Sequence, residues 1–522
     1  MANPPGVNVT VNTPSSSPNT NSPTGTWFVA GYTAGGPSGV AVPVNSIQDF
    51  NTYFGSYTNG AVAGRTSTSA SLYDSLDVYF REGGIRAYVS RVVGSAGSPA
   101  KATCTLGTSF LTLTATGYGA WANSSGTTST PASPAGLQVS AVSAGSGGFA
   151  LTVTYNGNQI GQTSPPLFAA NDAINWVNSL SSPGVLFSAA SAGSGSVPSL
   201  TSTPTYYYFA GGVDGTVSVS PDLSTDVTTA LAAFTTPLGS GQVSAPGITV
   251  ATVWQALGTH AIANNRVALL DAVDASSAAT LVSAAQGLQY GGTNALTDSS
   301  YAAMFAPWVK EPGIASTTPN TVAPTFTRTV APTAFAAAKI AASDITYDCN
   351  VPAAGVINGN CATAIDVTTT YSASDRATIN TAGVNLIRNI NGAVAVYGFR
   401  SLATDTNWIS FNNVRFRMQI IRDLDVVVEP FVFAEIDGKG QIFARLAGAV
   451  SGQCQLYWLR NSLYGVNPSD AFTVNTGPQI NTPTTIAAGQ LNVQVNLRMA
   501  PQAEQVAVTV TKYLVSTTLP SY

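Results

Sequence analysis

The feature that most constrains this chain is a strand pattern near its start with no partner in the surrounding sequence. Residues 6–11, GVNVTV, place Val7, Val9 and Val11 at every second position, which is the spacing of a β-strand with one apolar face. Residues 12–26, NTPSSSPNTNSPTGT, are rich in Pro, Ser and Asn and favour neither helix nor sheet. An isolated strand cannot satisfy its own backbone hydrogen-bonding groups, so its sheet must lie elsewhere.

The surface that such a chain presents carries very little charge. Asp, Glu, Lys and Arg make up only 8% of the 522 residues, while 44% are hydrophobic and 49 are glycine. A net charge of −4 gives little repulsion between copies, so we expect self-association. The 20 basic residues do not outnumber the 24 acidic ones and form no cluster with aromatic residues, so we expect no nucleic-acid partner.

The sequence also indicates the cellular compartment in which the protein is made. The start, MANPPGVNVT, does not have the pattern of a signal peptide, and no apolar run is long enough to span a bilayer. We therefore expect synthesis in the cytoplasm and no membrane insertion. Cys104 and Cys454 fall in apolar segments typical of buried thiols. Cys349 and Cys361 flank a loop that a disulfide would close in an oxidising compartment, and the sequence leaves both forms open.

Along the chain, hydrophobic periodicity predicts an α/β domain interrupted by a β-rich insertion. Residues 25–93 read as strand, turn, strand, two helices and a strong strand. From about 101 to 210, short alternating strands separated by Gly/Ser stretches indicate a β-sandwich-like module. The α/β pattern then resumes, with helices over 226–234 and 253–265 and a buried strand over 266–274.

The region from 370 to 522 has the clearest periodicity and predicts an α+β domain. Two helices are expected over 411–428 and 440–460, and strand alternation follows over 490–500 and 504–515. The apolar positions of the helices are Val414, Met418, Ile421 and Val428 in the first, and Phe443, Leu446, Val450, Cys454 and Tyr457 in the second.

Candidate chemistry is sparse. His260 is the only histidine, and no matching Asp and Ser elements complete a hydrolase triad, so we interpret it as a structural side chain. The segment 209–215, FAGGVDG, lacks the end of a phosphate-binding loop and reads as a tight turn. Asp271 and Asp274 end a buried strand, where ligand groups often lie, but two acids alone are common there. We therefore expect no enzymatic activity, no metal site and no cofactor.

The ordered motifs resemble contractile tail sheath proteins of contractile-tailed phages and related injection machines. The resemblance covers nearly all of residues 25–515 and is most specific in 379–421, INTAGVNLIRNINGAVAVYGFRSLATDTNWISFNNVRFRMQII. A departure is Ala331 to Ala334, where the family often has Pro-Pro-Ser-Gly. Further matching segments are GTWFVAGYTAGGP, GAWAN, FAGGVDG, SSYAAMFAPWVK, VAPTAFAAAKIAASD and WLRNSLYGVNPSDAFTV.

The resemblance implies a fold and a domain order. It implies a discontinuous, subtilisin-like α/β core without a triad, an inserted β-sandwich-like outer domain and an α+β C-terminal domain facing a tail tube. Extended arms at both ends would exchange strands between subunits. The expected ranges are 1–24 for the N-terminal arm and tether, 25–100 and 211–369 for the core, 101–210 for the insertion, 370–505 for the C-terminal domain and 506–522 for the C-terminal arm.

The resemblance also implies a function and partners. The subunit would polymerise into stacked hexameric rings around a tail tube, in a virion assembled in the host cytoplasm. Contraction triggered at the baseplate would drive the tube through the cell envelope and deliver a genome. The implied partners are further copies of the chain, the tail tube protein, and baseplate and tail terminator proteins. One alternative is the sheath of a phage-like, non-virion injection system. A distant alternative, a secreted β-rich adhesin or hydrolase, lacks the expected signal peptide and catalytic residues.

In the mechanism that the family implies, terminal strands join the C-terminal sheet of a neighbouring subunit. The tether from Asn12 to Gly25 has 14 residues and a maximum reach of roughly 45 Å at about 3.3 Å per residue, enough for an adjacent subunit. The expected strand-exchange residues are Val7, Val9, Val11, Val493, Val495, Val506, Val508 and Val510. Arg415, Arg417 and Arg422 are expected to face acidic groups on the tube, with ordinary pairs inside the subunit as the alternative.

Overall fold

The chain is built around a mixed β-sheet in the first of two units. The computed structural model describes residues 25–33, 35–55, 72–131, 135–179, 187–192, 197–215, 223–313, 327–502 and 504. The chain divides between Glu429 and Pro430. The first unit holds an eight-stranded sheet in which six central strands run parallel and the two edge strands are antiparallel. Its spatial order is β2 (Val42–Val44), β3 (Ala87–Arg91), β1 (Trp27–Gly31), β13 (Gly241–Ser244), β14 (Arg266–Asp271), β15 (Ala302–Ala306), β19 (Val384–Ile390) and β20 (Ala393–Val396).

Helices cover both faces of this sheet because the buried parallel strands are apolar on both sides. In β14, Val267 and Leu269 pack into one core and Ala268 and Leu270 into the other. One face is covered by α1 (Ile47–Phe54), α2 (Leu72–Arg81), α7 (Pro332–Thr346) and α10 (Phe411–Val428). The other face is covered by α4 (Leu223–Leu231), α5 (Ala251–Ala263), α6 (Ala278–Leu288) and α9 (Ala373–Thr381).

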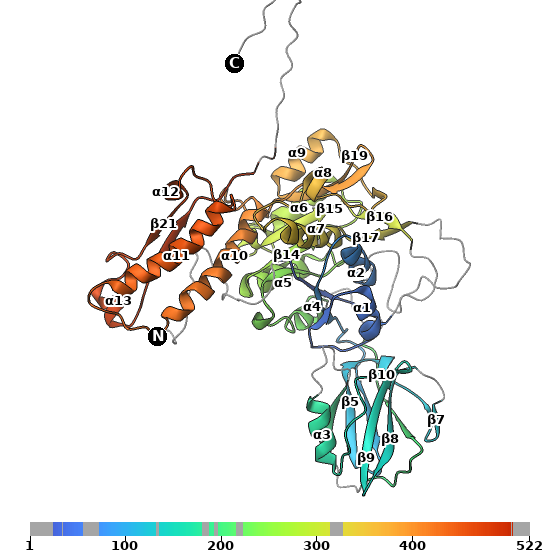
Figure 1. The fold of residues 1–522 in the computed structure, drawn as a ribbon. Helices are drawn as coiled ribbons and strands as arrows, with labels where there is room; N and C mark the ends of the chain where they lie inside the picture. Colours follow the sequence, from blue (N-terminus) through green and yellow to red (C-terminus); the bar gives the residue numbers. More distant parts are fainter. Residues whose placement is uncertain are drawn as a thin grey trace, which may run out of the picture. The chain divides into compact units, whose positions relative to one another are not determined.

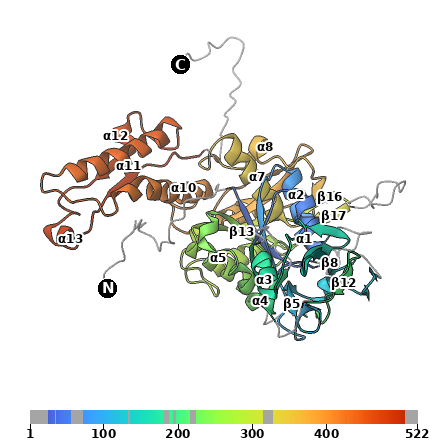
Figure 2. The ribbon, with the colours of Figure 1, turned by 60° about the horizontal axis from the view of Figure 1, so that its bottom comes forward.

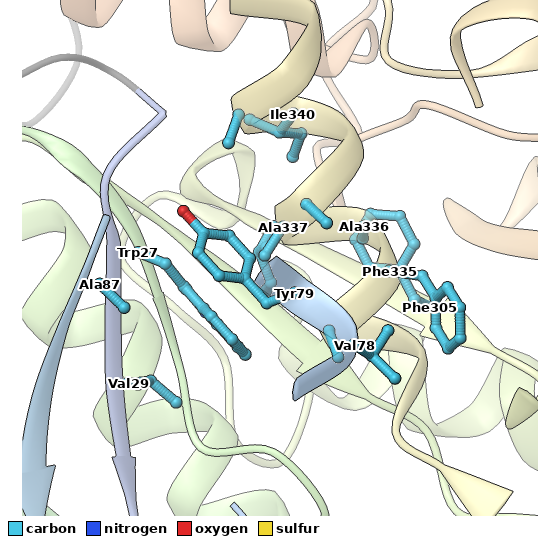
Figure 3. Packing of buried hydrophobic residues seen from close by; sticks show 14 of the residues in the cluster. Trp27, Val29, Val78, Tyr79, Ala87, Phe305, Phe335, Ala336, Ala337 and Ile340 are labelled. Carbon is cyan, nitrogen blue, oxygen red and sulfur yellow. The ribbon is translucent and has the colours of Figure 1, made fainter. Parts of the chain in front are cut away.

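The first face is held by aromatic packing between β1, α2 and α7. The rings of Trp27 and Tyr79 lie 4.8 Å apart between centroids, and Ala337 of α7 lies next to Tyr79 in the same core (Figure 3). The Trp27 indole N–H donates to Ser244 Oγ at 2.8 Å, and the Tyr79 hydroxyl donates to the carbonyl of Arg86 at 2.8 Å. Both polar ends of these large side chains are therefore satisfied inside the core.

A β-rich module interrupts this unit between β3 and α4 and has its own hydrophobic core (Figure 2). Two antiparallel sheets contribute to that core, with Leu113 from one and Val139 from the other. The four-stranded sheet is β10 (Asn158–Ile160), β9 (Gly148–Tyr155), β8 (Leu137–Gly145) and β12 (Thr205–Tyr208). The three-stranded sheet is β11 (Phe187–Ala192), β5 (Leu111–Tyr118) and β4 (Lys101–Leu106), and α3 (Ala170–Ser179) and the short pair β6 (Gly126–Thr127) and β7 (Thr130–Pro131) complete the module.

The second unit consists of one long helix and a small sheet. Figure 1 shows α11 (Gln441–Leu459) alongside β21 (Phe472–Asn475), which pairs with β22 (Gln494–Leu497). The predicted stripe is confirmed as buried at Leu446, Val450, Cys454 and Tyr457, whereas at its start Ile442 is buried and the expected Phe443 is only partly buried. Two short helices, α12 (Pro468–Ala471) and α13 (Pro483–Ala487), flank the strands.

The expected domain boundary at 370 differs from the structure. Residues 384–396 form β19 and β20, and β19 pairs in parallel with β15 of the central sheet. Helix α10 also belongs to the first unit, whose boundary falls after Glu429. Period-two alternation predicts a strand but not which sheet it joins, which is the physical reason for the difference. Within the described part of the chain, none of the helices combines the length and apolar character needed to cross a membrane.

Candidate functional site

The strongest candidate for a binding site is the two-stranded sheet of the second unit. Strands β21 and β22 pair antiparallel, with Val474 opposite Val495 and Phe472 opposite Leu497. Val495 and Leu497 are half-buried while Gln494 and Asn496 are exposed, so the sheet has one apolar and one polar face. Of the residues expected to take part in strand exchange, Val495 thus lies in β22 and Val493 just before it.

Both strands of this sheet are edge strands among the described residues. The Arg498 N–H donates to the carbonyl of Ala471 at 2.8 Å, so the even-numbered residues of β22 face β21. By alternation, the backbone groups of Val495 and Leu497 point to the outer edge of β22. Those of Val474 point to the outer edge of β21 in the same way, whereas the N–H of Phe472 donates to the carbonyl of Pro468 at the end of α12. Each edge therefore presents N–H and C=O groups suited to an added strand.

The connection between the two strands is held by one buried asparagine. Asn481 is 4% exposed, and its amide nitrogen donates to the carbonyls of Thr476 at 3.0 Å and Asn492 at 2.8 Å. The Asn492 N–H donates to Asn481 Oδ1 at 2.7 Å, which closes the loop. The sequence reasoning missed this residue. The available signal was an asparagine in a Gly/Pro-rich segment between two strand patterns, which is typical of side-chain to backbone bonding.

The other expected strand-exchange residues, Val7, Val9, Val11, Val506, Val508 and Val510, lie outside the described residues. The point where the N-terminal arm meets the core is described. The Gly25 carbonyl accepts from Gln242 Nε2 at 3.1 Å and lies 3.4 Å from the Tyr79 hydroxyl oxygen, and Trp27 is fully buried. The root of the arm is therefore anchored at Gly25.

The expectation that Arg415 presents its charge on an outer face is corrected by the structure. Its side chain is 0% exposed and pairs with Asp344 of α7. The alternative, a pair inside the subunit, applies instead. Arg422 lies further along α10, is 21% exposed and pairs with Asp423 at 2.8 Å. The first half of α10 is buried nearly all round, so helical periodicity alone does not identify an exposed face there.

Arg417 is likewise buried inside the first unit. Its side chain is 3% exposed, and its guanidinium lies over the rings of Tyr301 and Trp408, 4.4 and 4.3 Å from their centroids. It also donates to Ser300 Oγ at 3.0 Å and lies 3.6 Å from a carboxylate oxygen of Asp298. These contacts fasten α10 to the segment before β15 and leave this arginine unavailable to an external partner.

The candidate catalytic residues have structural roles. Arg266 donates to His260 Nε2 at 2.8 Å. Burial and the charge of Arg266 lower the pKa of His260 to about 3, so the ring stays neutral. Asp271 accepts hydrogen bonds from the Gly247 N–H and from both donors of Thr333. Asp274 accepts from the Thr368 hydroxyl at 2.6 Å. The buried Asp271 carboxylate is thus fully engaged within the fold.

The glycine-rich segment 209–215 closes the stem of the inserted module. Asn123 of the GAWAN segment bonds both backbone groups of Gly212: its amide donates to the carbonyl at 2.9 Å and its Oδ1 accepts from the N–H at 2.8 Å. Asp214 accepts from the Ala120 N–H at 3.2 Å. The segment follows β12, which ends at Tyr208, but it does not form the expected tight turn: Ala210 and Val213 pair antiparallel with Thr103 and Ala100.

The cysteines are free thiols. All four, which lie in described segments, are buried and unpaired, so Cys349 and Cys361 do not form a disulfide in this structure. Burial raises the pKa of Cys361 to about 12. The Cys349 thiol donates to Gln419 Oε1 at 2.7 Å. The described residues contain no group of three or more His, Cys, Asp or Glu side chains arranged to hold a metal ion.

Comparison with known proteins finds the fold in contractile sheaths. No family model matches the sequence, and no curated protein is found to be similar to it. By structure, the chain is similar to a chain of the contracted baseplate of the anti-feeding prophage, with a TM-score of 0.56, 17% identity and 97% of both chains covered.

Two sheath structures agree with that match. The helical sheath of the anti-feeding prophage in its contracted state gives a TM-score of 0.52 at 16% identity, covering 98% of this chain and 99% of that one. The sheath tail protein of Listeria innocua gives 0.53 at 14% identity, covering 88% and 90%. The mixed α/β fold of this chain is therefore the fold of contractile tail sheath proteins, over nearly its whole length.

Proposed function

We propose that the chain is the subunit of a contractile tail sheath. It polymerises into stacked hexameric rings that surround a tail tube, and it contracts to drive that tube through a cell envelope. The observation that carries this proposal is a small sheet whose two edges have no partner strand among the described residues, in a chain with the fold of sheath proteins. In this proposal, the eight-stranded unit is the subtilisin-like core, and the module between β3 and α4 is the outer domain.

The joint between subunits is a strand added to the β21–β22 sheet of a neighbour. Residues 6–11 supply that strand, residues 12–24 form the tether, and the end of the chain contributes residues 506–510. About five backbone hydrogen bonds at a net ~1 kcal/mol each make one such joint weak. A helical lattice contains many joints in parallel, so the assembly holds together cooperatively.

Contraction without nucleotide requires an extended lattice that is metastable relative to the contracted one. A joint on a flexible tether suits this requirement, because rigid cores rotate and slide while the added strand stays paired. The anchoring of Gly25 by Gln242 and Tyr79 transmits that movement from the arm to the core. The low charge of the chain limits repulsion between the closely packed copies.

The tube-facing surface is proposed to include the second half of α10. Arg422 is the remaining candidate of the three arginines, since Arg415 and Arg417 are buried in pairs. The baseplate and tail terminator are the proposed partners at the two ends of the sheath. Solved structures with this fold include both an extracellular contractile injection system and sheath tail proteins, so a phage-like particle is the second candidate. Electron microscopy of intact particles distinguishes a virion from a phage-like particle, because only the virion carries a head filled with nucleic acid.

Negative-stain microscopy of the purified full chain tests the proposed function directly. Helical tubes or striated sheaths of the expressed protein support it, whereas a protein that remains a folded monomer at high concentration contradicts it. Truncation of the arm and substitutions at the two sheet edges, described below, separate the strand-exchange joint from other contacts between copies.

A further inference from the structure

Among the residues that the structure describes, a buried cluster of charged side chains in the first unit contains one more acid than base. It lies between α2, α7 and a three-stranded sheet of β17 (Thr327–Val330), β16 (Val309–Pro312) and β18 (Asp366–Val367). The cations are Arg81, Arg328 and Lys339, and the carboxyl groups are Asp74, Asp77, Glu82 and Glu311. Three cations facing four carboxylates would leave a net negative charge in a water-poor site, which is costly.

The geometry around Thr363 shows how this charge is avoided. Thr363 Oγ1 lies 2.5 Å from Glu82 Oε1 and 2.5 Å from Glu311 Oε1. A hydroxyl group has a single proton to donate, and two ionised carboxylates at that distance from one oxygen would need two. One of the two carboxyl groups must therefore carry a proton and donate it to the hydroxyl oxygen.

The partners of the two glutamates decide which one carries the proton. Glu82 lies 2.5 Å from Lys339 Nζ and accepts from the Thr363 N–H at 2.6 Å and the Ala362 N–H at 3.2 Å. Burial opposes its ionisation, but Lys339 and Thr363 outweigh burial and hold the pKa of Glu82 below its usual value. Glu82 is therefore the carboxylate.

Glu311 has a weaker set of partners. The Glu311 side chain is 0% exposed. Arg81 donates to Glu311 Oε2 at 2.8 Å, but Arg81 is 39% exposed and also pairs with Asp77. The second cation, Arg328, lies 3.7 Å from Glu311 Oε2. Burial raises the pKa of Glu311, although Thr363, Arg81 and Arg328 act in the opposite direction. The remaining groups that face this pair are Asp74 and Asp77 of α2, Lys339 of α7 and the Cys361 thiol.

We infer that Glu311 is a buried proton-binding site of the core, whose proton passes along a chain from Glu311 Oε1–H to Thr363 Oγ1 and from the Thr363 hydroxyl to Glu82. With this proton bound, three cations face three carboxylates. The site joins β16 to α2 and to the loop before β18. Loss of the proton introduces an uncompensated charge at this junction. The inference concerns the folded subunit and does not depend on the proposed sheath function.

The sign of the pH dependence follows from the raised pKa of Glu311. A group that binds its proton more tightly when folded stabilises the fold fully at pH values below its unfolded pKa. That contribution is lost as the pH rises through the folded pKa. Glu311 therefore contributes stability that is lost as the pH rises, whereas Glu82, whose pKa is lowered, contributes stability that is lost as the pH falls.

The test is Glu311→Gln in the full chain, because glutamine reproduces the protonated acid. Its amide N–H donates to Thr363, and its carbonyl still accepts from Arg81. We expect the thermal midpoint of Glu311→Gln at about pH 7.5 to equal or exceed that of the wild type. We also expect the midpoint of the variant, measured relative to that of the wild type, to be higher at about pH 7.5 than at about pH 5, because this comparison cancels the contribution of the other titrating groups.

The matched control is Glu82→Gln, the same substitution at the other carboxyl group that contacts the Thr363 hydroxyl. It removes a true carboxylate from Lys339, so the midpoint falls by several degrees at both pH values. Thr363→Val, which breaks the relay, lowers the midpoint similarly, while Thr363→Ser retains it. If Glu311→Gln lowers the midpoint as much as Glu82→Gln at both pH values, Glu311 is an ordinary ionised partner and the inference is overturned.

Discussion

Asp271, at the end of β14, caps the start of α7 through Thr333, which lies 62 residues further along the chain. Its two carboxylate oxygens accept from the Thr333 N–H at 2.8 Å and from the Thr333 hydroxyl at 2.9 Å. The helix starts after Ala331, whose methyl group accepts no hydrogen bond, so the cap comes from the sheet instead. The contact fixes the start of α7 over the carboxyl end of the central strands.

Removal of this cap is expected to destabilise the first unit. Asp271→Ala leaves three buried donors without their acceptor, those of Gly247 and Thr333, and we expect a loss of about 2–4 kcal/mol in the free energy of unfolding. Chemical denaturation measures it. Asp274→Ala, at an exposed carboxylate three residues on, is the matched control and should cost less than about 1 kcal/mol. Equal losses would contradict the capping role.

His260 is expected to make the protein sensitive to acid. Its pKa is lowered to about 3 by burial and Arg266, so its contribution to stability is complete above the ordinary pKa of about 6.5 and is lost as the pH falls toward 3. Between pH 6.5 and 5 this amounts to about 1–2 kcal/mol. His260→Gln should lose less stability than the wild type over that interval. Since the chain has one histidine, its ring-proton NMR signal should not titrate between pH 7 and 5.

Proline substitutions at the two sheet edges test where a strand is added. Val495→Pro removes an N–H that points to the outer edge of β22, and Val474→Pro does the same for β21 at the paired position. We expect both variants to keep a cooperative unfolding transition, because neither N–H bonds the other strand. One of the two should fail to form tubes in negative stain. If both variants form normal tubes, the joint between subunits does not involve a strand added to either edge of this sheet.

Deletion of residues 1–20 is expected to leave a folded protein that does not polymerise. The anchor of the arm at Gly25 and Trp27 is retained, so the cores stay intact. Light scattering and microscopy measure assembly, and circular dichroism verifies the fold. A synthetic peptide of residues 1–20 added to the truncated protein should bind without restoring tubes. Tubes of normal width from the truncated protein would contradict strand exchange by the N-terminal arm.

Charge reversal along α10 separates structural from tube-facing arginines. Arg415→Glu places a carboxylate beside the buried Asp344, and we expect a loss of about 3–5 kcal/mol or failure to fold. Arg422→Glu, at a partly exposed position, should fold normally. If the second half of α10 faces the tube, we expect a smaller fraction of the sheaths formed by Arg422→Glu to contain a tube. Unchanged co-assembly with the tube protein would exclude Arg422 from that contact.

The local elements of this protein follow closely from its sequence. The predicted strand at 266–274 is confirmed as β14, and the predicted helices at 253–265 and 411–428 are confirmed as α5 and α10. These segments have long, regular hydrophobic patterns, and such patterns record which side of an element is buried.

The sequence by itself thus determined most of the elements and the interruption of the core by a β-rich module. Only the tertiary structure decided that the polar positions Arg415 and Arg417 are buried, because Asp344 and Asp298 approach them from distant segments. It likewise decided that β19 joins the central sheet, and that Glu82 and Glu311 share the Thr363 hydroxyl across more than 200 residues of sequence. Hydrophobic periodicity describes only how residues are arranged along one helix or strand. Charge pairing, strand register and proton sharing depend on groups brought together by folding from elsewhere in the chain.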